Sequence, residues 1–308
     1  MRKVPELSLS QFTDGDRAAR AAFSEALSAG LREYGFVILT DHNVALPLLE
    51  RAYALAGEVF ALPEAEKRRY AGGLRGYTPF GIEHAKGNPT PDLKEFWQIG
   101  HDPEPGRAPS PFSAPNVWPE RPADFQTVFQ DLFAALNETG CLLLEALAPT
   151  LGLAEDYFEP LVRRGDSVLR VLHYPPIGKD ADPGAVRAAA HEDINLLTIL
   201  VAARGAGLEL LDRDGAWLPV RTEVNALIVD SGDMMARLTN NVIPATTHRV
   251  VNSEQSQTSR YSMPFFMHPT PETSLAALAS CIGAGASHAP ISAGDFLAER
   301  LKEIGLKA

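Results

Sequence analysis

HEDINLLTILV, residues 191–201, combines a His-x-Asp pair with an apolar run rich in Leu, Ile, Val and Thr. In an extended strand, residues two positions apart face the same side. We therefore expect the imidazole of His191 and the carboxylate of Asp193 to point together into the interior of a sandwich or barrel. A His-x-Asp pair on its own is more often a pair of surface or turn residues, so this interpretation depends on the rest of the chain.

The second half of the chain repeats this pattern of short apolar runs bounded by turn residues. Such runs occupy residues 168–174, 194–201, 208–211, 226–229, 248–251 and 261–267. Short strands with regular turn signals predict a β-sandwich or barrel. A Rossmann fold is excluded, because no Gly-x-Gly-x-x-Gly motif opens a helix and strands do not alternate with helices here.

The first half is predicted to be mainly helical. Apolar residues recur at helical spacing, which predicts amphipathic helices over residues 19–34, 44–60 and 125–147. Gly35 ends the first of these helices, and residues 36–39 are predicted to form a buried strand. Residues 102–122 contain seven prolines, and we expect a long irregular loop there.

Composition narrows the possible partners and location. The 308 residues include 45% hydrophobic and 22% charged residues, which excludes a disordered chain, a coiled coil and a collagen-like fibre. The net charge of −11 favours neither nucleic acid nor anionic membrane as a partner. The two cysteines, Cys141 and Cys281, provide no disulfide framework, and we find no signal peptide or membrane-length apolar run. We expect a cytoplasmic protein, and the composition leaves its oligomeric state open.

His248 is a candidate partner for the His-x-Asp pair. It follows His191 by 57 residues, with about four predicted strands between them, so a sandwich can bring the two strands together. Two histidines and one carboxylate on one face of an octahedral ion form the facial triad of non-haem Fe(II) oxygenases. The same donors also suit zinc, so His191, Asp193 and His248 do not by themselves identify the metal.

An Arg-x-Ser pair follows His248 by twelve residues. If residues 253–259 form the turn of a hairpin, Arg260 and Ser262 share one face of a strand beside that of His248, with Arg260 about 10 Å from the histidine. A five-carbon diacid that chelates a metal through its keto-acid end could reach Arg260 with its other carboxylate. The planar fork of arginine suits a carboxylate, and Ser262 can add a hydroxyl donor.

Further motifs extend the pattern over nearly the whole chain. They are Gly35–Ile38 with Asp41-His42, FALP (60–63) with Lys67, Gly76-Tyr77 with Pro79 and Gly81, DLKE (92–95), LRVLHYPP (169–176), Gly232-Asp233, Thr239-Asn240 and PISAG (290–294). Together with the His-x-Asp, His and Arg-x-Ser residues, they make the chain resemble the isopenicillin N synthase-like branch of the 2-oxoglutarate- and Fe(II)-dependent dioxygenases.

This resemblance implies a mainly β fold with flanking helices (α+β), built on a double-stranded β-helix, or jelly roll. We expect a single dioxygenase domain over residues 1–308. Its helix-rich N-terminal part would cover 1–165, the jelly-roll core with the metal site 166–270, and a C-terminal tail and helix 271–308.

The resemblance also assigns roles to residues. His191, Asp193 and His248 would be the iron ligands, Arg260 and Ser262 would hold the distal carboxylate of 2-oxoglutarate, and Tyr174 would add a hydroxyl. The chain departs from the family motif at Leu172, where the family usually has Asn. An amide near the cosubstrate is therefore missing.

The implied function is oxidation of a small molecule, by hydroxylation, desaturation or ring closure, coupled to oxidative decarboxylation of 2-oxoglutarate with Fe(II) and O₂. The identity of the substrate cannot be read from these motifs. One alternative is a family oxidase or synthase that does not use 2-oxoglutarate. Others are a zinc hydrolase and a non-catalytic jelly roll that binds a ligand.

Overall fold

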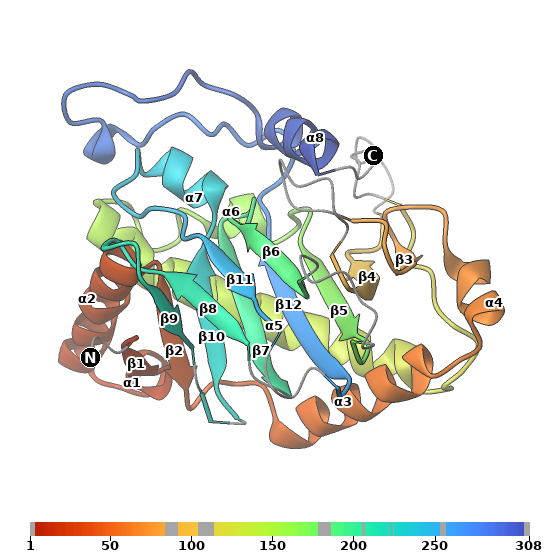
Figure 1. Ribbon diagram of the computed structural model, residues 1–308. Helices are drawn as coiled ribbons and strands as arrows, with labels where there is room; N and C mark the ends of the chain where they lie inside the picture. The colour runs from red at the N-terminus through yellow and green to blue at the C-terminus, as the bar shows by residue number, and fades with distance from the viewer. Residues whose placement is uncertain are drawn as a thin grey trace.

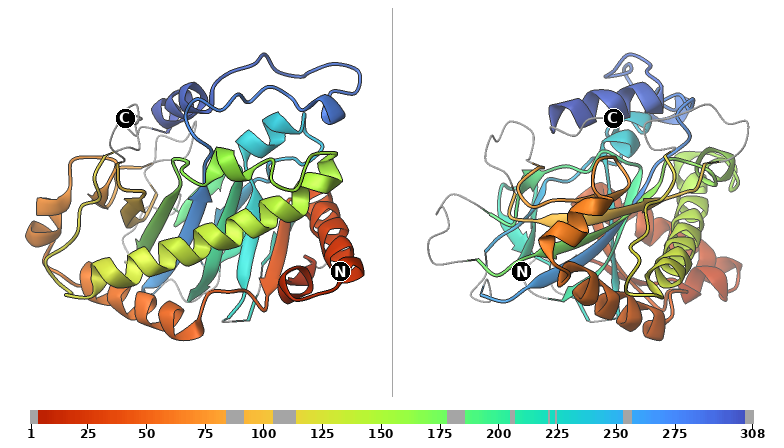
Figure 2. Two further views of the ribbon diagram at one scale, coloured as in Figure 1. Left: turned by 180° about the vertical axis from the view of Figure 1, so that it is seen from behind. Right: turned by 90° about the vertical axis from the view of Figure 1, so that its right-hand side faces the viewer.

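The protein is known from a computed structural model, which describes residues 4–83, 92–103, 114–177, 186–204, 207–220, 222–223, 225–252 and 257–304. Two β-sheets face each other, and helices cover the outer side of the larger sheet (Figures 1 and 2). The larger sheet has the order β1 (Glu6–Ser8), β2 (Phe36–Thr40), β10 (Leu227–Ser231), β7 (Leu197–Arg204), β12 (Arg260–Met267), β5 (Val168–Tyr174), β4 (Glu95–Gly100) and β3 (Gly76–Thr78). The smaller sheet has the order β6 (Ala188–His191), β11 (His248–Val250), β8 (Leu208–Leu211) and β9 (Trp217–Pro219).

The order of the strands along the chain makes the core a double-stranded β-helix. From β5 onward the chain passes from the larger sheet to β6, returns to β7, and crosses again to the hairpin of β8 and β9. It then returns to β10, crosses to β11 and ends in β12 of the larger sheet. The predicted jelly-roll core with flanking helices is confirmed. Strands β1 to β4, which precede this core in the sequence, extend its larger sheet at both edges.

Strand alternation determines what faces the space between the sheets. In β5 and β12 the even-numbered residues face this space, whereas the odd-numbered residues pack toward the helices on the outer side. The apolar run 194–201 departs from its predicted bounds, because β7 begins only at Leu197. The carbonyls of Asp193, Ile194 and Asn195 instead accept hydrogen bonds from the first backbone amides of helix α7 (Asp233–Leu238).

The long helices match the predicted periodicity. They are α2 (Arg17–Tyr34), α3 (Leu46–Phe60) and α5 (Phe125–Leu147); shorter helices are α1 (Ser10–Thr13), α4 (Glu64–Lys67), α6 (Glu159–Val162) and α8 (Ala293–Glu303), and the 3₁₀ turns are Arg68–Tyr70, Ala148–Leu151 and Ala279–Cys281. Gly35 ends α2 with a left-handed φ of 68°. A Cβ at this position would lie 1.6 Å from the hydroxyl oxygen of Thr246, so the turn into β2 requires glycine.

Helix α5 crosses the back of the larger sheet (Figure 2). Together with the turn that follows it, residues 125–151, it is long and apolar enough to span a membrane by length and composition alone. Core helices of globular proteins meet the same criteria. Here the apolar stripe predicted for this helix is buried within the molecule: Phe125, Phe129, Leu132, Leu136, Leu143 and Leu147 are all inaccessible to solvent.

The proline-rich segment has neither helix nor strand where the structure describes it, at residues 102–103 and 114–122; residues 104–113 lie outside the described part. At the other end of the chain, helix α8 lies above β6 in Figure 1. Leu297, Arg300 and Leu301 of this helix reach the space between the two sheets. Arg300 is held there by an ion pair with Asp233, at 2.8 Å.

Candidate active site

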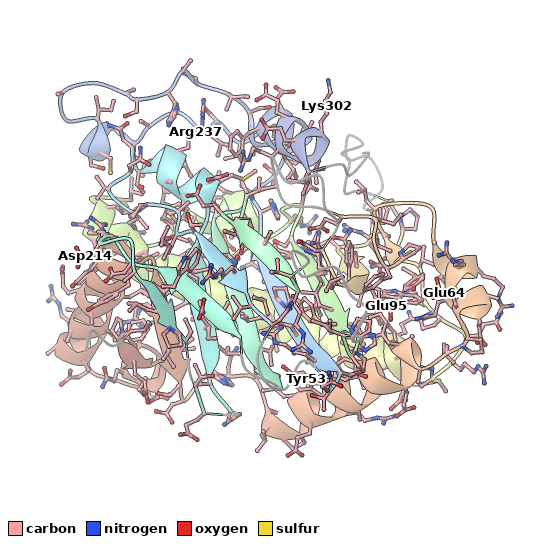
Figure 3. The ribbon with its side chains drawn as sticks, viewed as in Figure 1. Tyr53, Glu64, Glu95, Asp214, Arg237 and Lys302 are labelled. Carbon is pink, nitrogen blue, oxygen red and sulfur yellow. The ribbon has the colours of Figure 1, made fainter. Side chains whose placement is uncertain are left out.

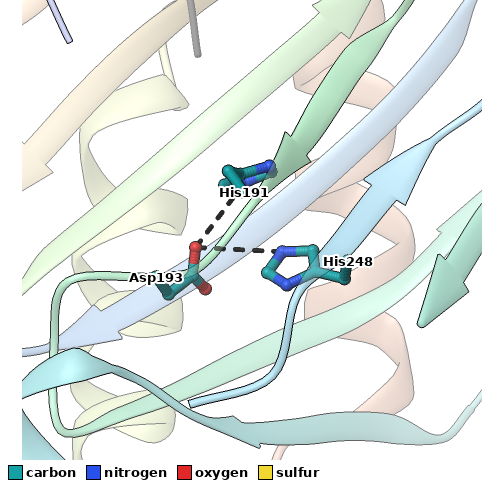
Figure 4. A group of neighbouring side chains, drawn as sticks. All are labelled: His191, Asp193 and His248. Atoms are coloured by element: carbon teal, nitrogen blue, oxygen red, sulfur yellow. Dashed lines mark ion pairs between the residues drawn. The ribbon is translucent and has the colours of Figure 1, made fainter. Parts of the chain in front are cut away.

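His191, Asp193 and His248 converge on one point between the two sheets (Figure 4). His191 ends β6 and is directly opposite His248, which begins β11. Asp193 lies in the loop after β6, with one carboxylate oxygen 3.7 Å from Nε2 of His191 and 3.8 Å from Nε2 of His248. One ligand atom from each residue lies within 4.8 Å of the other two, which places all three within reach of a single ion.

Backbone carbonyls orient both imidazoles. Nδ1 of His191 lies 2.8 Å from the carbonyl of Ala189, and Nδ1 of His248 lies 3.1 Å from the carbonyl of Thr246. Because a carbonyl only accepts, each Nδ1 carries a proton, and in the neutral form of each ring Nε2 directs its lone pair toward Asp193. Burial lowers the pKa of His191 to about 4, and the neighbouring His248 contributes to this lowering, so His191 is neutral at physiological pH.

Asp193 is the anionic member of the group. Burial alone would raise its pKa, but His248, His191 and the hydroxyl of Thr198 hold the pKa below its usual value. The Thr198 hydroxyl donates a hydrogen bond to the second carboxylate oxygen. Beside it, burial and the Asp193 charge raise the pKa of Asp230 well above its ordinary value. Two neutral nitrogens and one oxygen on one face are the donors that Fe(II) takes in a facial triad, and the arrangement therefore fits this ion.

The predicted hairpin between His248 and Arg260 is wrong. β11 belongs to the smaller sheet and β12 to the larger one, so the two strands do not pair. The chain crosses between the sheets after Val250, and residues 253–256, at the centre of the predicted turn, lie outside the described part. Arg260 instead pairs with Tyr174 of β5, and it faces the triad across the cavity rather than along one sheet.

Arg260 and Ser262 nevertheless line the same cavity as the triad. Arg260 is 1% exposed, and within the described part of the chain its Nε and Nη1 have no hydrogen-bond partner. Its guanidinium lies 5.0 Å from the ring centre of Tyr174. A buried guanidinium with unused donors is chemically complementary to a carboxylate, so this end of the cavity fits the distal end of 2-oxoglutarate. The role predicted for the Tyr174 hydroxyl stays a prediction.

Leu172 occupies an apolar part of this end. It pairs with Ser262 across the strands and packs with Phe96 and Tyr174. The amide that the family motif usually supplies here is thus replaced by apolar surface, next to the buried arginine.

A wall of paired charges, which the sequence analysis did not identify, completes the cavity of about 430 Å³. Arg170 donates to Glu83 at 2.9 Å and to the side-chain oxygen of Gln98 at 2.8 Å. Lys94 donates to Asp92 at 2.8 Å and to Glu83 at 3.2 Å. The signal for this wall was strand alternation: Arg170 precedes Leu172 and Tyr174 by two and four positions on the same strand.

The other buried histidines have different partners or surroundings. His173 points to the outer side of the larger sheet, where it bonds to Glu95 at 2.7 Å and to Ser259 at 3.0 Å. Glu95, labelled in Figure 3, also forms an ion pair with Lys67 of α4, at 2.6 Å. His268, just after β12, lines the cavity and was missed; burial lowers its pKa to about 4.

Two family models match the chain. Residues 4–121 match the model described as non-haem dioxygenase in morphine synthesis N-terminal, and residues 165–269 match the 2OG-Fe(II) oxygenase superfamily.

Similar proteins cover almost all of the chain. A 2-oxoglutarate-Fe(II) type oxidoreductase, hxnY of Emericella nidulans, is 32% identical over 97% of this chain and 89% of its own. A crystal structure of a 2OG-Fe(II) oxygenase family protein from Caulobacter crescentus is 40% identical with a TM-score of 0.87, and covers 98% of this chain and 99% of that one. A full-length Neurospora crassa protein, crystallised in complex with alpha-KG and thymine, is 27% identical with a TM-score of 0.87. The match covers 97% of this chain and 96% of that one.

Proposed function

The chain belongs to the 2OG-Fe(II) oxygenase superfamily, and on this premise we propose that His191, Asp193 and His248 are the ligands of its iron. The protein is a 2-oxoglutarate- and Fe(II)-dependent dioxygenase, an oxidoreductase with O₂ as its second cosubstrate. Bound iron supplies the oxidative decarboxylation of 2-oxoglutarate and the coupled oxidation of a small molecule. The convergence of the three side chains, with both Nε2 lone pairs directed inward, is the observation that carries this assignment.

The residues around the triad prepare it for a cation. The carbonyls of Ala189 and Thr246 hold the two imidazoles in the tautomer that leaves Nε2 free. The hydroxyl of Thr198 fixes the rotation of the Asp193 carboxylate. Such supporting hydrogen bonds orient metal ligands and increase metal affinity.

Arg260 and Ser262 hold the distal carboxylate of 2-oxoglutarate, with Tyr174 beside them. Arg260 is buried with unused donors on its guanidinium, and Ser262 lies two residues further along the same face of β12. The bound carboxylate pairs with a guanidinium that has no counter-charge among the described residues. Leu172 excludes water from the same end of the cavity.

The substrate is a small molecule that lies against the Arg170 wall. Arg170 and Gln98 present fixed polar groups there, and the ring of Phe266 lies beside the Arg170 guanidinium, at 5.3 Å. Such a wall suits a small planar molecule with hydrogen-bonding edges. The complex of the similar Neurospora crassa protein with thymine supports this choice. Helix α8 covers this part of the cavity through Leu297 and Leu301.

We propose further that residues 1–308 act as one dioxygenase domain, because strands from both halves share the larger sheet. The free thiols of Cys141 and Cys281 support a cytoplasmic location. The acidic surface supports a protein that works without nucleic-acid or membrane partners.

Succinate release tests the function. The full chain, loaded anaerobically with Fe(II) and 2-oxoglutarate, is mixed with O₂ and a panel of small heterocycles that includes thymine. We expect succinate to form in step with O₂ consumption, and to be lost in His248→Ala. Consumption of O₂ with a substrate but without succinate would contradict the proposed function.

A further inference from the structure

Two buried arginines lie side by side near the cosubstrate end of the cavity. Arg260 begins β12, and Arg187 immediately precedes β6 in the smaller sheet. Arg187 is 2% exposed, and its Nε has no hydrogen-bond partner among the residues that the structure describes. Its guanidinium donates one hydrogen bond, at 2.8 Å, to the carbonyl of Thr258, two residues before Arg260. Arg187 thus bridges the two sheets beside the residue assigned to 2-oxoglutarate.

The electrostatic surroundings of Arg187 are unusual for a buried cation. Burial lowers its pKa, and the neighbouring Arg260 guanidinium lowers it further. Among the residues that the structure describes, neither arginine forms an ion pair with a carboxylate. Buried charges are normally paired, because an unpaired charge in a low-dielectric interior is costly.

The other cations of the cavity have partners. Lys94 is paired with Asp92 and Glu83, and Arg170 is paired with Glu83. Arg300 is paired with Asp233. Of the described lysines and arginines that line the cavity, Arg260 alone is left without a counter-charge, and Arg187 lies behind it, outside the lining itself. Their combined charge is therefore available to an anion that enters this end of the cavity.

We propose that Arg187 is a second guanidinium of the cosubstrate subsite, whose charge adds to that of Arg260 in holding the distal carboxylate of 2-oxoglutarate. The proposal rests on the role assigned to Arg260 above. It makes Arg187 a positioning residue that acts on the bound diacid through its charge. A subsite with two guanidinium groups binds a dicarboxylate even when no metal holds the keto-acid end.

This property gives a test that does not depend on turnover. Glutarate has the same five-carbon chain and two carboxylates but no keto group, so it reports on the carboxylate subsite alone. Binding of 2-oxoglutarate and of glutarate is measured by calorimetry on the full-length, metal-free protein. The variants are Arg187→Gln, Arg187→Met, Arg187→Lys and Arg260→Gln. The control is Arg213→Gln, which removes an exposed arginine that also donates to a backbone carbonyl.

We expect Arg187→Gln and Arg187→Met to raise the dissociation constants of both diacids equally, by about tenfold, which corresponds to ~1.4 kcal/mol. Arg187→Lys keeps the charge and should bind within about threefold of the parent. The melting temperature of the ligand-free Arg187→Met protein should not fall, because the variant removes an unpaired buried charge. A purely structural role, through the bond to Thr258, predicts the opposite pattern: Gln tolerated better than Met, and a lower melting temperature.

Parent-like affinity of Arg187→Gln and Arg187→Met for both diacids overturns the proposal. If neither uncharged variant folds, Arg187→Lys decides, because an affinity as weak as that of Arg260→Gln would show that charge is not what Arg187 provides. The same measurements distinguish a failure of the role proposed for Arg187 from a failure of the role proposed for Arg260. Weak binding by Arg260→Gln with parent-like Arg187 variants overturns this inference alone, whereas parent-like binding by Arg260→Gln also removes the proposed carboxylate site.

Discussion

The cavity and the residues directly behind its lining form two kinds of charged region. On the wall of β4 and β5, Lys94 and Arg170 are paired with carboxylates, so the charges of this wall cancel. At the other two places they do not cancel. The triad combines one carboxylate with two imidazoles, and the Arg187–Arg260 pair has no carboxylate among the described residues.

This difference between paired and unpaired charges indicates which side chains are available to bind a ligand. A buried charge is stable when it is paired or when it coordinates an ion. The paired wall meets this condition within the protein, and it can serve as a rigid surface for substrate. The triad and the arginine pair would meet it with a cation and an anion, and we propose that these are Fe(II) and 2-oxoglutarate.

Loss of the negative charge of the triad should have the largest effect. Asp193→Ala leaves two neutral imidazoles, and we expect the Fe(II) dissociation constant to rise by about 10³-fold or more, or ~4 kcal/mol. Anaerobic equilibrium dialysis with metal analysis measures this constant. Glu192→Ala is the matched control, because it removes the exposed neighbouring carboxylate. Parent-like binding by Asp193→Ala would exclude it as a ligand.

Loss of the positive charge of Arg260 should affect only the cosubstrate. A diacid bound to Arg260→Gln leaves a buried carboxylate without this partner, at a cost of roughly 3–5 kcal/mol, or about 10²–10³-fold in the half-saturating 2-oxoglutarate concentration. Arg260→Lys should fall between, because it keeps the charge but loses the fork. Fe(II) affinity should not change. A flat series in 2-oxoglutarate-dependent succinate release would refute this role of Arg260.

Loss of a hydrogen bond that supports a triad residue should reduce Fe(II) affinity less than loss of the triad residue itself. Thr198→Val removes the hydroxyl that donates to Asp193 while keeping the shape of the side chain. We expect Fe(II) affinity to fall by about 10–100-fold. Thr198→Ser keeps the donor and should remain close to the parent in the same dialysis. Equal losses in both variants would point to packing rather than to the hydrogen bond.

A substitution in the paired wall should lower the stability of the fold and leave cosubstrate affinity unchanged. Glu83→Gln weakens its bonds to Arg170 and Lys94, and the free energy of unfolding at neutral pH should fall by about 1–3 kcal/mol. Cosubstrate affinity should be unchanged. Denaturant titration measures the first quantity and calorimetry the second.

The pH dependence of this loss has a definite sign. Burial alone would raise the pKa of Glu83, but Arg170 and Lys94 lower it to about 2. The stability from ionised Glu83 is therefore fully present above its unfolded pKa of about 4.3, and is lost as the pH falls toward 2. The difference between parent and Glu83→Gln should shrink over this range. A difference that does not vary with pH would contradict the pairing.

The sequence indicated which residues gather at the cavity better than it indicated how their strands pair. Spacing and residue type singled out His191, Asp193, His248, Arg260 and Ser262, and the structure brings all five to one cavity. Strand alternation holds for Arg260 and Ser262, whereas Asp193 lies in the loop after β6. Their roles stay predictions. The hairpin between His248 and Arg260 was wrong, because the turn residues after Val250 do not reveal whether the chain pairs locally or crosses to the other sheet.

The missed residues depend on contacts that are distant in the sequence. Glu83, which lies between β3 and β4, is 87 positions from Arg170 of β5, and the two form an ion pair only in the folded chain. Alternation from Tyr174 back to Arg170, or from Ser262 forward to His268, could have identified the residues that face the cavity. It could not have shown which charges are paired. Arg187 carried no motif, and only the three-dimensional structure shows that it has no carboxylate partner among the described residues.

A crystal structure grown without O₂ in the presence of Fe(II) and 2-oxoglutarate tests the central claim, that the uncompensated charges are the ligand sites. We expect the metal to lie about 2.0–2.2 Å from Nε2 of His191, Nε2 of His248 and a carboxylate oxygen of Asp193, by analogy with zinc sites. The distal carboxylate should contact Arg260, and the Glu83–Arg170 pair should stay intact. A carboxylate seated on Lys94 or Arg170, with Arg260 left unpaired, would contradict the account.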